Sequence, residues 1–171
     1  LNVLSWIIFL GLCIEAGGII FNSIFTHFIN PVAANNFWEG IDFSALYSFD
    51  YGYFFVIVLL MSIVAILKAL MFYQIVNALN YKKLNLSEPF SIGLRKVIVN
   101  IAYIVLAIGL FSIFGIGYSQ WLAEKNISMP KVEKMGFDGA GVWLFMSIIL
   151  FVIAQIFKRG IELQEENDLT I

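Results

Sequence analysis

Two charged residues fall inside long apolar runs, where few other groups can do chemistry. Glu15 lies near the middle of the first run, and Lys68 lies within the second. If these runs cross a bilayer, a charge near its centre costs at least ~2.5 kcal/mol, and such residues are candidates for function by default. The residues then either pair inside a helix interface or form a proton or cation site.

Glu15 and Lys68 are expected at similar depths. At ~1.5 Å per residue, with both chain ends on one side, their heights differ by roughly 5 Å, so the two side chains can meet. Lys68 can instead extend to the headgroups at the nearer membrane edge. The sequence leaves both arrangements open.

A stripe of small and polar residues surrounds Glu15. Gly11, Glu15, Gly18 and Asn22 recur at one helix face, and small residues on a face allow another helix to approach closely. Asn100 and Gln155 add polar groups to later runs. Hydrogen bonding between helices is the simpler interpretation of all these groups, and a conduction path is the alternative.

The chain offers no catalytic constellation. It has one histidine, His27, and one cysteine, Cys13, which do not make a metal centre. No nucleophile motif and no phosphate-binding loop is present. We therefore expect no enzymatic activity, no catalytic residue, no metal and no cofactor, and the net charge of −2 gives no sign of nucleic-acid binding.

Composition defines the elements that must position these residues. Of 171 residues, 61% are hydrophobic and 13% are charged, and the mean hydropathy is +0.90. Soluble domains are typically ~45–50% apolar and ~25% charged. So much apolar surface needs lipid to cover it, and the sequence predicts an integral membrane protein.

Four apolar runs reach the ~20 residues that a helix needs to cross a bilayer. They cover residues 3–28, 53–79, 97–118 and 142–157. Because the runs lack period-2 alternation, helices are favoured over a barrel. We predict an all-α, polytopic four-helix transmembrane bundle that forms a single membrane domain over residues 1–171. The first loop, 29–52, is rich in aromatic residues and is expected to carry a short interfacial helix.

Basic residues predict the orientation. The segment 80–96 and the end of the last run carry six of them, and the loop between the third and fourth runs carries three that are balanced by acidic residues. Both termini, the loop 80–96 and the tail 158–171 are therefore expected in the cytoplasm. The six are Lys82, Lys83, Arg95, Lys96, Lys158 and Arg159, and the three are Lys125, Lys131 and Lys134.

The acidic tail and the basic loop are expected on the same side. We predict that the tail folds back on the loop through a network of ion pairs with apolar anchors such as Phe90 and Leu163. A mobile tail is the alternative. The resulting cytoplasmic interaction patch comprises Phe90, Arg95, Lys96, Arg159, Glu166, Asn167, Asp168 and Leu169.

Two stretches carry a family resemblance. One is Leu84 to Lys96 with Pro89 to Ser91, and the other is Ile156 to Ile171 with Arg159-Gly160 and Glu166 to Thr170. In both, the chain resembles DUF2975, a family of small four-span bacterial membrane proteins of unknown function. The resemblance implies a four-helix protein of the bacterial cytoplasmic (inner) membrane with both ends inside. Genes of this family often lie beside a small helix-turn-helix regulator, which implies a sensory or regulatory role.

Two functions follow as hypotheses. The first is a non-enzymatic interaction or regulatory component that contacts membrane lipid and binds another membrane or cytoplasmic protein through its patch. The second is a small homo-oligomeric transporter or channel that uses Glu15 and Lys68. A transporter needs a water path to Glu15, whereas an interaction protein needs Glu15 sealed and the patch open.

Overall fold

The computed structural model describes residues 2–80 and 90–168. In chain order its elements are α1 (Asn2–Phe28), the 3-10 helix η1 (Pro31–Asn36), α2 (Ser44–Phe49), α3 (Tyr51–Asn80), α4 (Ile92–Glu124) and α5 (Ala140–Asp168). Helices α1, α3, α4 and α5 are long and apolar enough to cross a membrane. The predicted all-α fold with four membrane-length helices is confirmed.

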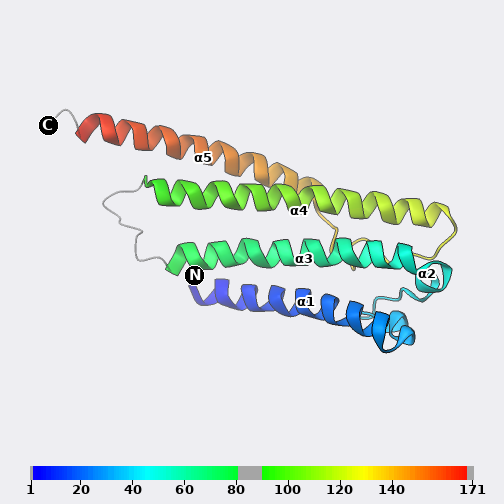
Figure 1. Cartoon of the computed structure of the whole chain (residues 1–171). Coiled ribbons are helices and arrows are strands. Elements are labelled where there is room, and N and C mark those ends of the chain that lie inside the picture. Colours follow the sequence, from blue (N-terminus) through cyan, green and yellow to red (C-terminus); the bar gives the residue numbers. More distant parts are fainter. Residues whose placement is uncertain (1, 81–89, 169–171) are drawn as a thin grey trace.

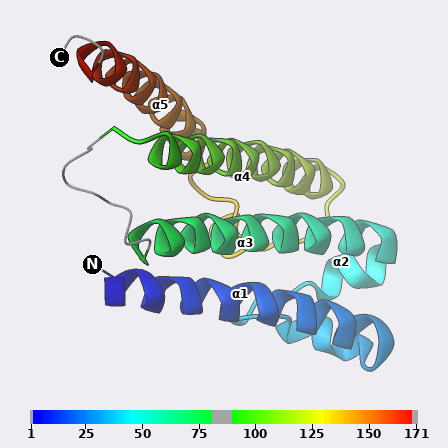
Figure 2. The same ribbon diagram turned by 60° about the vertical axis from the view of Figure 1, so that its left-hand side comes forward.

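The four long helices stand in a row (Figure 1). Helix α1 packs on α3, α3 packs on α4, and α4 packs on α5, and in the described part of the chain α1 contacts neither α4 nor α5. The view in Figure 2, turned by 60°, shows the same order. The arrangement is therefore open and does not close on itself. We call the end with both chain termini the terminal end and the opposite end the α2 end.

Two helices extend beyond their predicted spans. Helix α4 begins at Ile92 because Ser91 is extended and its hydroxyl accepts a 3.2 Å hydrogen bond from the Leu94 N–H, a typical N-cap. Helix α5 continues to Asp168, so residues 158–168 do not fold back as predicted. Good helix-forming residues and i,i+3 and i,i+4 pairs favour this continuation.

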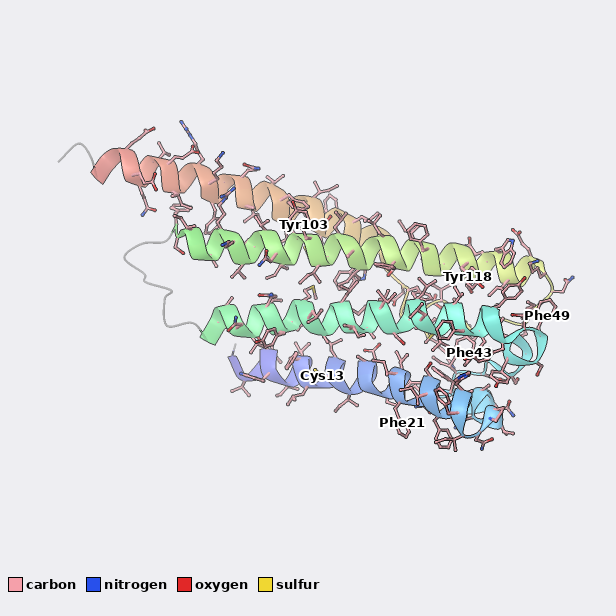
Figure 3. The ribbon with its side chains drawn as sticks, in the orientation of Figure 1. Cys13, Phe21, Phe43, Phe49, Tyr103 and Tyr118 are labelled. Carbon is pink, nitrogen blue, oxygen red and sulfur yellow. The ribbon has the colours of Figure 1, made fainter. Side chains whose placement is uncertain are left out.

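The first loop forms a compact cap at the α2 end. Phe37, Phe43 and Phe54 are at most 2% exposed, and their rings meet edge to face with centroids 5.6–5.8 Å apart. Figure 3 shows Phe43 inside this end of the molecule, whereas Phe21 points away from α3. The expected short helix is α2. Asp42 lies just before this helix. Its carboxyl accepts hydrogen bonds from Ser44, with the larger effect from the side chain and the smaller from the backbone N–H, and both hold the pKa of the carboxyl below its usual range.

The segment 125–139 runs back into the molecule. It leaves the end of α4 and returns along α3 and α4 to the start of α5 (Figure 1). Gly109, near the middle of α4, contacts Leu144 in the second turn of α5. Helix α5 therefore begins about halfway along α4, and the segment 125–139 occupies the space beyond its start.

Candidate functional site

The residues at mid-depth converge on one backbone group. The Lys68 Nζ, near the middle of α3, donates a 2.9 Å hydrogen bond to the Gly136 carbonyl. A Cβ placed on Gly136 would lie 3.7 Å from Lys68 Nζ and 3.8 Å from Glu15 Oε1. The predicted proximity of Glu15 and Lys68 is therefore present, and the segment 125–139 lies against both of them. We call these three residues the mid-depth cluster.

The cluster differs from both arrangements expected for Lys68. Glu15 and Lys68 do not form an ion pair within 4.0 Å, and Lys68 binds a backbone carbonyl of the segment 125–139 instead of extending to the membrane edge. Glu15 is half-buried and makes no hydrogen bond to a described residue. An ammonium group at this depth is stabilised by the carbonyl dipole together with a carboxylate close by.

The small-residue stripe on α1 receives a side chain and not a helix. The ring of Trp38, from the first loop, lies directly over Gly18. Asn22 donates a 2.8 Å hydrogen bond to the Gly18 carbonyl of its own helix, and Gly11 has nothing within 4 Å of a built Cβ. At Gly18, an aromatic side chain and not a helix therefore occupies the space that the missing side chain leaves.

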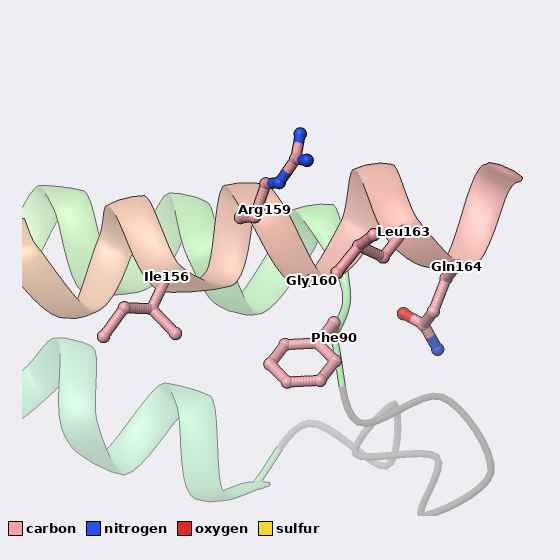
Figure 4. Close-up of a pocket in the computed structure, with 6 residues that line it drawn as sticks. All are labelled: Phe90, Ile156, Arg159, Gly160, Leu163 and Gln164. Atoms are coloured by element: carbon pink, nitrogen blue, oxygen red, sulfur yellow. The ribbon is translucent and has the colours of Figure 1, made fainter.

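A second site lies at the terminal end, between the start of α4 and the last turns of α5 (Figure 4). Here α5 diverges from α4, as both ribbon views show. The gap is a groove of about 430 Å³. Its lining residues are Phe90, Ile156, Arg159, Gly160, Leu163 and Gln164. We call it the terminal groove.

Phe90 forms the floor of the terminal groove. Its ring meets Phe157 edge to face at 5.3 Å and lies against Gly160, where a Cβ would come within 2.6 Å of the ring. Phe90 thus packs the start of α4 against α5. Because Gly160 has no side chain, α5 leaves room for the ring.

A family model described as "Protein of unknown function (DUF2975)" matches residues 24–171. The chain belongs to the DUF2975 family. The match covers α3, α4 and α5 completely and includes both the mid-depth residues Lys68 and Gly136 and the terminal groove. No curated protein and no solved structure matches the chain.

In this DUF2975 chain the predicted patch is only partly one surface. Phe90 and Arg159 line the terminal groove, and the Arg159 guanidinium donates a 3.2 Å hydrogen bond to Glu162 on its own helix. Arg95 is half-buried, and its buried Nε has no hydrogen-bond partner among the described residues. The other described side chains of the patch are exposed, namely Lys96 and Glu166.

Some predicted contacts fall outside what the structure describes. Lys82, Lys83 and Leu169 lie outside the described residues, and Asn167 and Asp168 belong to the last turn of α5. The predicted ion pairs between tail and loop therefore stay a prediction. The described ion pairs of α5 join Lys158 and Arg159 to Glu162 within the helix.

The remaining predicted polar residues do not join either site. Asn100 and Gln155 are both exposed on their helices. Within residues 2–80 and 90–168, no three His, Cys, Asp or Glu side chains gather to hold a metal ion. The candidate sites among the described residues are therefore the mid-depth cluster and the terminal groove.

Sequence reasoning missed Gly136 and Trp38, which are loop residues that lie against the long helices. A backbone carbonyl acceptor has no residue-type signal. An indirect signal does exist, because Met135 and Phe137 flank Gly136 and both are at most 2% exposed. Large apolar residues in a segment too short and polar to span a membrane indicate that it packs inside the protein.

Proposed function

We propose that this DUF2975 chain is a non-enzymatic membrane component that binds a protein partner at the terminal groove, on the cytoplasmic side. The observation that carries the proposal is the extension of α5. This helix continues to Asp168 and diverges from α4, which leaves an apolar-floored groove of about 430 Å³ between them. Such a groove suits an apolar anchor residue presented by a partner helix.

The orientation rests on charge. Arg95, Lys96, Lys158 and Arg159 all lie at the terminal end, near the points where α4 begins and α5 leaves its apolar part. The segment 125–139 leaves α4 at the opposite end and carries three lysines, which nearby acidic residues balance. An excess of basic residues in short loops favours the cytoplasmic side.

The groove has the composition of a binding site for protein. Phe90, Ile156 and Leu163 provide apolar contact, and the polar Arg159 and Gln164 stand beside them. Interfaces between proteins combine an apolar centre with a polar rim. Beyond Arg159 the helix carries an excess of acidic residues, so the partner is expected to place basic side chains next to its apolar anchor.

The state of Glu15 agrees with this proposal. The segment 125–139 lies against Glu15 and Lys68 through Gly136, whereas Arg159 and Leu163 at the groove are exposed. These contacts suit a protein that acts through its cytoplasmic surface and not through the two charged residues at mid-depth.

Site-specific photo-crosslinking in native membranes tests the proposal. A photoreactive residue at Leu163 should give one adduct of discrete mass, and the same residue at Val152, which is 55% exposed on the apolar part of α5, should give none of that mass. Gly160→Leu, whose side chain would displace the Phe90 ring from the groove floor, should abolish the adduct. Gly93→Leu is the control because nothing lies within 4 Å of its Cβ position. An adduct that survives Gly160→Leu, or no adduct at Leu163, would refute groove binding.

The mid-depth cluster supports a second candidate, a small homo-oligomeric transporter or channel. Its specific observation is the approach of Glu15 and Lys68 to the same point on Gly136. Such a transporter should move protons or monovalent cations across liposomes, and Glu15→Gln should reduce that flux at least tenfold. Liposomes without measurable flux from the unchanged protein would rule this candidate out.

A further inference from the structure

The segment 125–139 is an irregular stretch of chain inside the apolar part of the molecule. Ile127, Met135 and Phe137 are 7%, 2% and 0% exposed, and Phe137 fills the space over Gly115 on α4. Irregular backbone is tolerated at membrane depth only where protein or water surrounds it. The segment therefore depends on its contacts with α3 and α4 to remain inside.

Among the described hydrogen bonds, one joins this segment to a long helix through a charged side chain. The Lys68 Nζ donates to the Gly136 carbonyl, far along the chain, at 2.9 Å. An ammonium group has three N–H donors, and hydrogen bonds to charged groups are stronger than neutral ones. Loss of this bond leaves both a charge and a carbonyl without their partner inside the protein.

We propose that Lys68 is a latch that holds the segment 125–139 inside the molecule, and that Glu15 is the alternative partner to which Lys68 turns when the segment is released. The inference goes beyond partner binding at the terminal groove and does not depend on it. Because α5 begins at Ala140, directly after the segment, the latch also fixes how deep α5 starts.

The alternative partner is already in place. Glu15 Oε1 and Lys68 Nζ both lie within 4 Å of the same position on Gly136, and Glu15 has no hydrogen bond to a described residue. A carboxylate attracts an ammonium more strongly than a carbonyl does, but the exchange leaves the Gly136 carbonyl without its donor. The proposed exchange of Lys68 between its two partners rests on the balance of these opposing terms.

Gly136 suits this role because of its backbone. Its φ is +75°, in the left-handed region that favours glycine. A Cβ there would touch both Lys68 and Glu15 at ordinary contact distance. Gly139 also has a positive φ, of +69°, but it lies against Trp143 and away from both charged residues. Alanine substitutions at the two glycines can therefore be compared, because both positions have a left-handed backbone and only Gly136 lies beside Lys68 and Glu15.

Cysteine labelling in lipid nanodiscs, which expose both faces, tests the latch. In a Cys13→Ala background, Met135→Cys should react slowly with a membrane-impermeant maleimide, and Lys131→Cys, at an exposed position, should react fast. Lys68→Met should speed labelling of Met135→Cys at least tenfold. Lys68→Gln, which keeps an N–H donor, should change it less than threefold. Ser62→Ala, which removes a hydrogen bond within α3, should leave the rate unchanged.

Glu15→Gln separates a latch from general loosening. If Glu15 is the alternative partner, its neutralisation favours the bond to Gly136, so labelling of Met135→Cys should stay at or below its original rate. Equal acceleration by Glu15→Gln and Lys68→Met would show loosening and overturn the alternative-partner role. An unchanged rate in folded Lys68→Met protein would overturn the latch itself.

A second comparison needs no change at Lys68. With Ile127→Cys as the reporter, which is remote in sequence from both glycines, Gly136→Ala should speed labelling at least fivefold more than Gly139→Ala. Both substitutions place a side chain on a left-handed backbone and carry a similar cost for it. Only the first places a methyl group against Lys68 and Glu15, so an equal effect of the two would contradict the proposal.

Discussion

At the scale of single residues, three glycines on the long helices leave space for aromatic side chains to pack against the helix backbone. Gly18 receives Trp38, Gly115 receives Phe137, and Gly160 receives Phe90. In each case a bulky aromatic ring from a loop or a helix start lies against a long helix. The missing side chain is what permits the close approach. These contacts bind loops and helix ends to helices, in a chain where the helices themselves meet only their neighbours in the row.

Gly115→Ala tests one of these contacts. A Cβ there would come within 2.6 Å of the Phe137 ring, so the ring must move, and overpacking of this kind costs about 1–3 kcal/mol. Gly117→Ala is the matched control on the same helix, because nothing lies within 4 Å of its Cβ. Thermal unfolding in detergent, followed by circular dichroism, should show a lower Tm for Gly115→Ala only. Equal Tm values for the two variants would contradict the described packing.

At the scale of elements, the cap formed by η1 and α2 is held by an aromatic cluster. Phe43 is fully buried between Phe37 and Phe54, and its N–H donates a 2.8 Å hydrogen bond to the Ala34 carbonyl. The cluster fastens the first loop to the start of α3. Sequence reasoning predicted an aromatic interfacial cap here, but only the structure shows which rings point inward.

Phe43→Ala should therefore destabilise the protein strongly. Truncation of a buried phenylalanine typically costs about 3–5 kcal/mol. Phe49→Ala, at a position 56% exposed, is the control and should change stability by less than about 1 kcal/mol. Chemical unfolding in mixed micelles measures both. Similar values for the two variants would show that Phe43 does not hold the cap.

At the scale of the whole molecule, the row leaves two edges. Helices α1 and α5 each have a neighbour on one side only, and each exposes large apolar residues such as Ile14 at 67% and Val142 at 67%. In a membrane, lipid or another protein covers such a face. Both termini lie at the same end (Figure 1), as an even number of crossings requires.

The orientation of the row gives a prediction at this scale. In a Cys13→Ala background, Lys131→Cys should react with an impermeant maleimide on intact cells, and Glu165→Cys should react only after permeabilisation. Both positions are exposed. The reverse pattern would overturn the cytoplasmic placement of the terminal groove, and reaction of both from one side would contradict four crossings.

The sequence alone determined the all-α class, the existence of four spans and the similar depth of Glu15 and Lys68. Hydrophobicity acts locally, so runs of apolar residues reveal spans without knowledge of neighbours. Residue spacing along helices likewise fixes depth, because each residue advances a helix by ~1.5 Å.

The tertiary structure alone decided the row, the return of the segment 125–139 and the partner of Lys68. Each depends on contacts between residues far apart in the chain, and the acceptor at Gly136 is a backbone carbonyl, which every residue has. The positive φ that brings this carbonyl into position has no unique residue signal either. Local composition placed the charges at the same depth, and long-range packing determined what they touch.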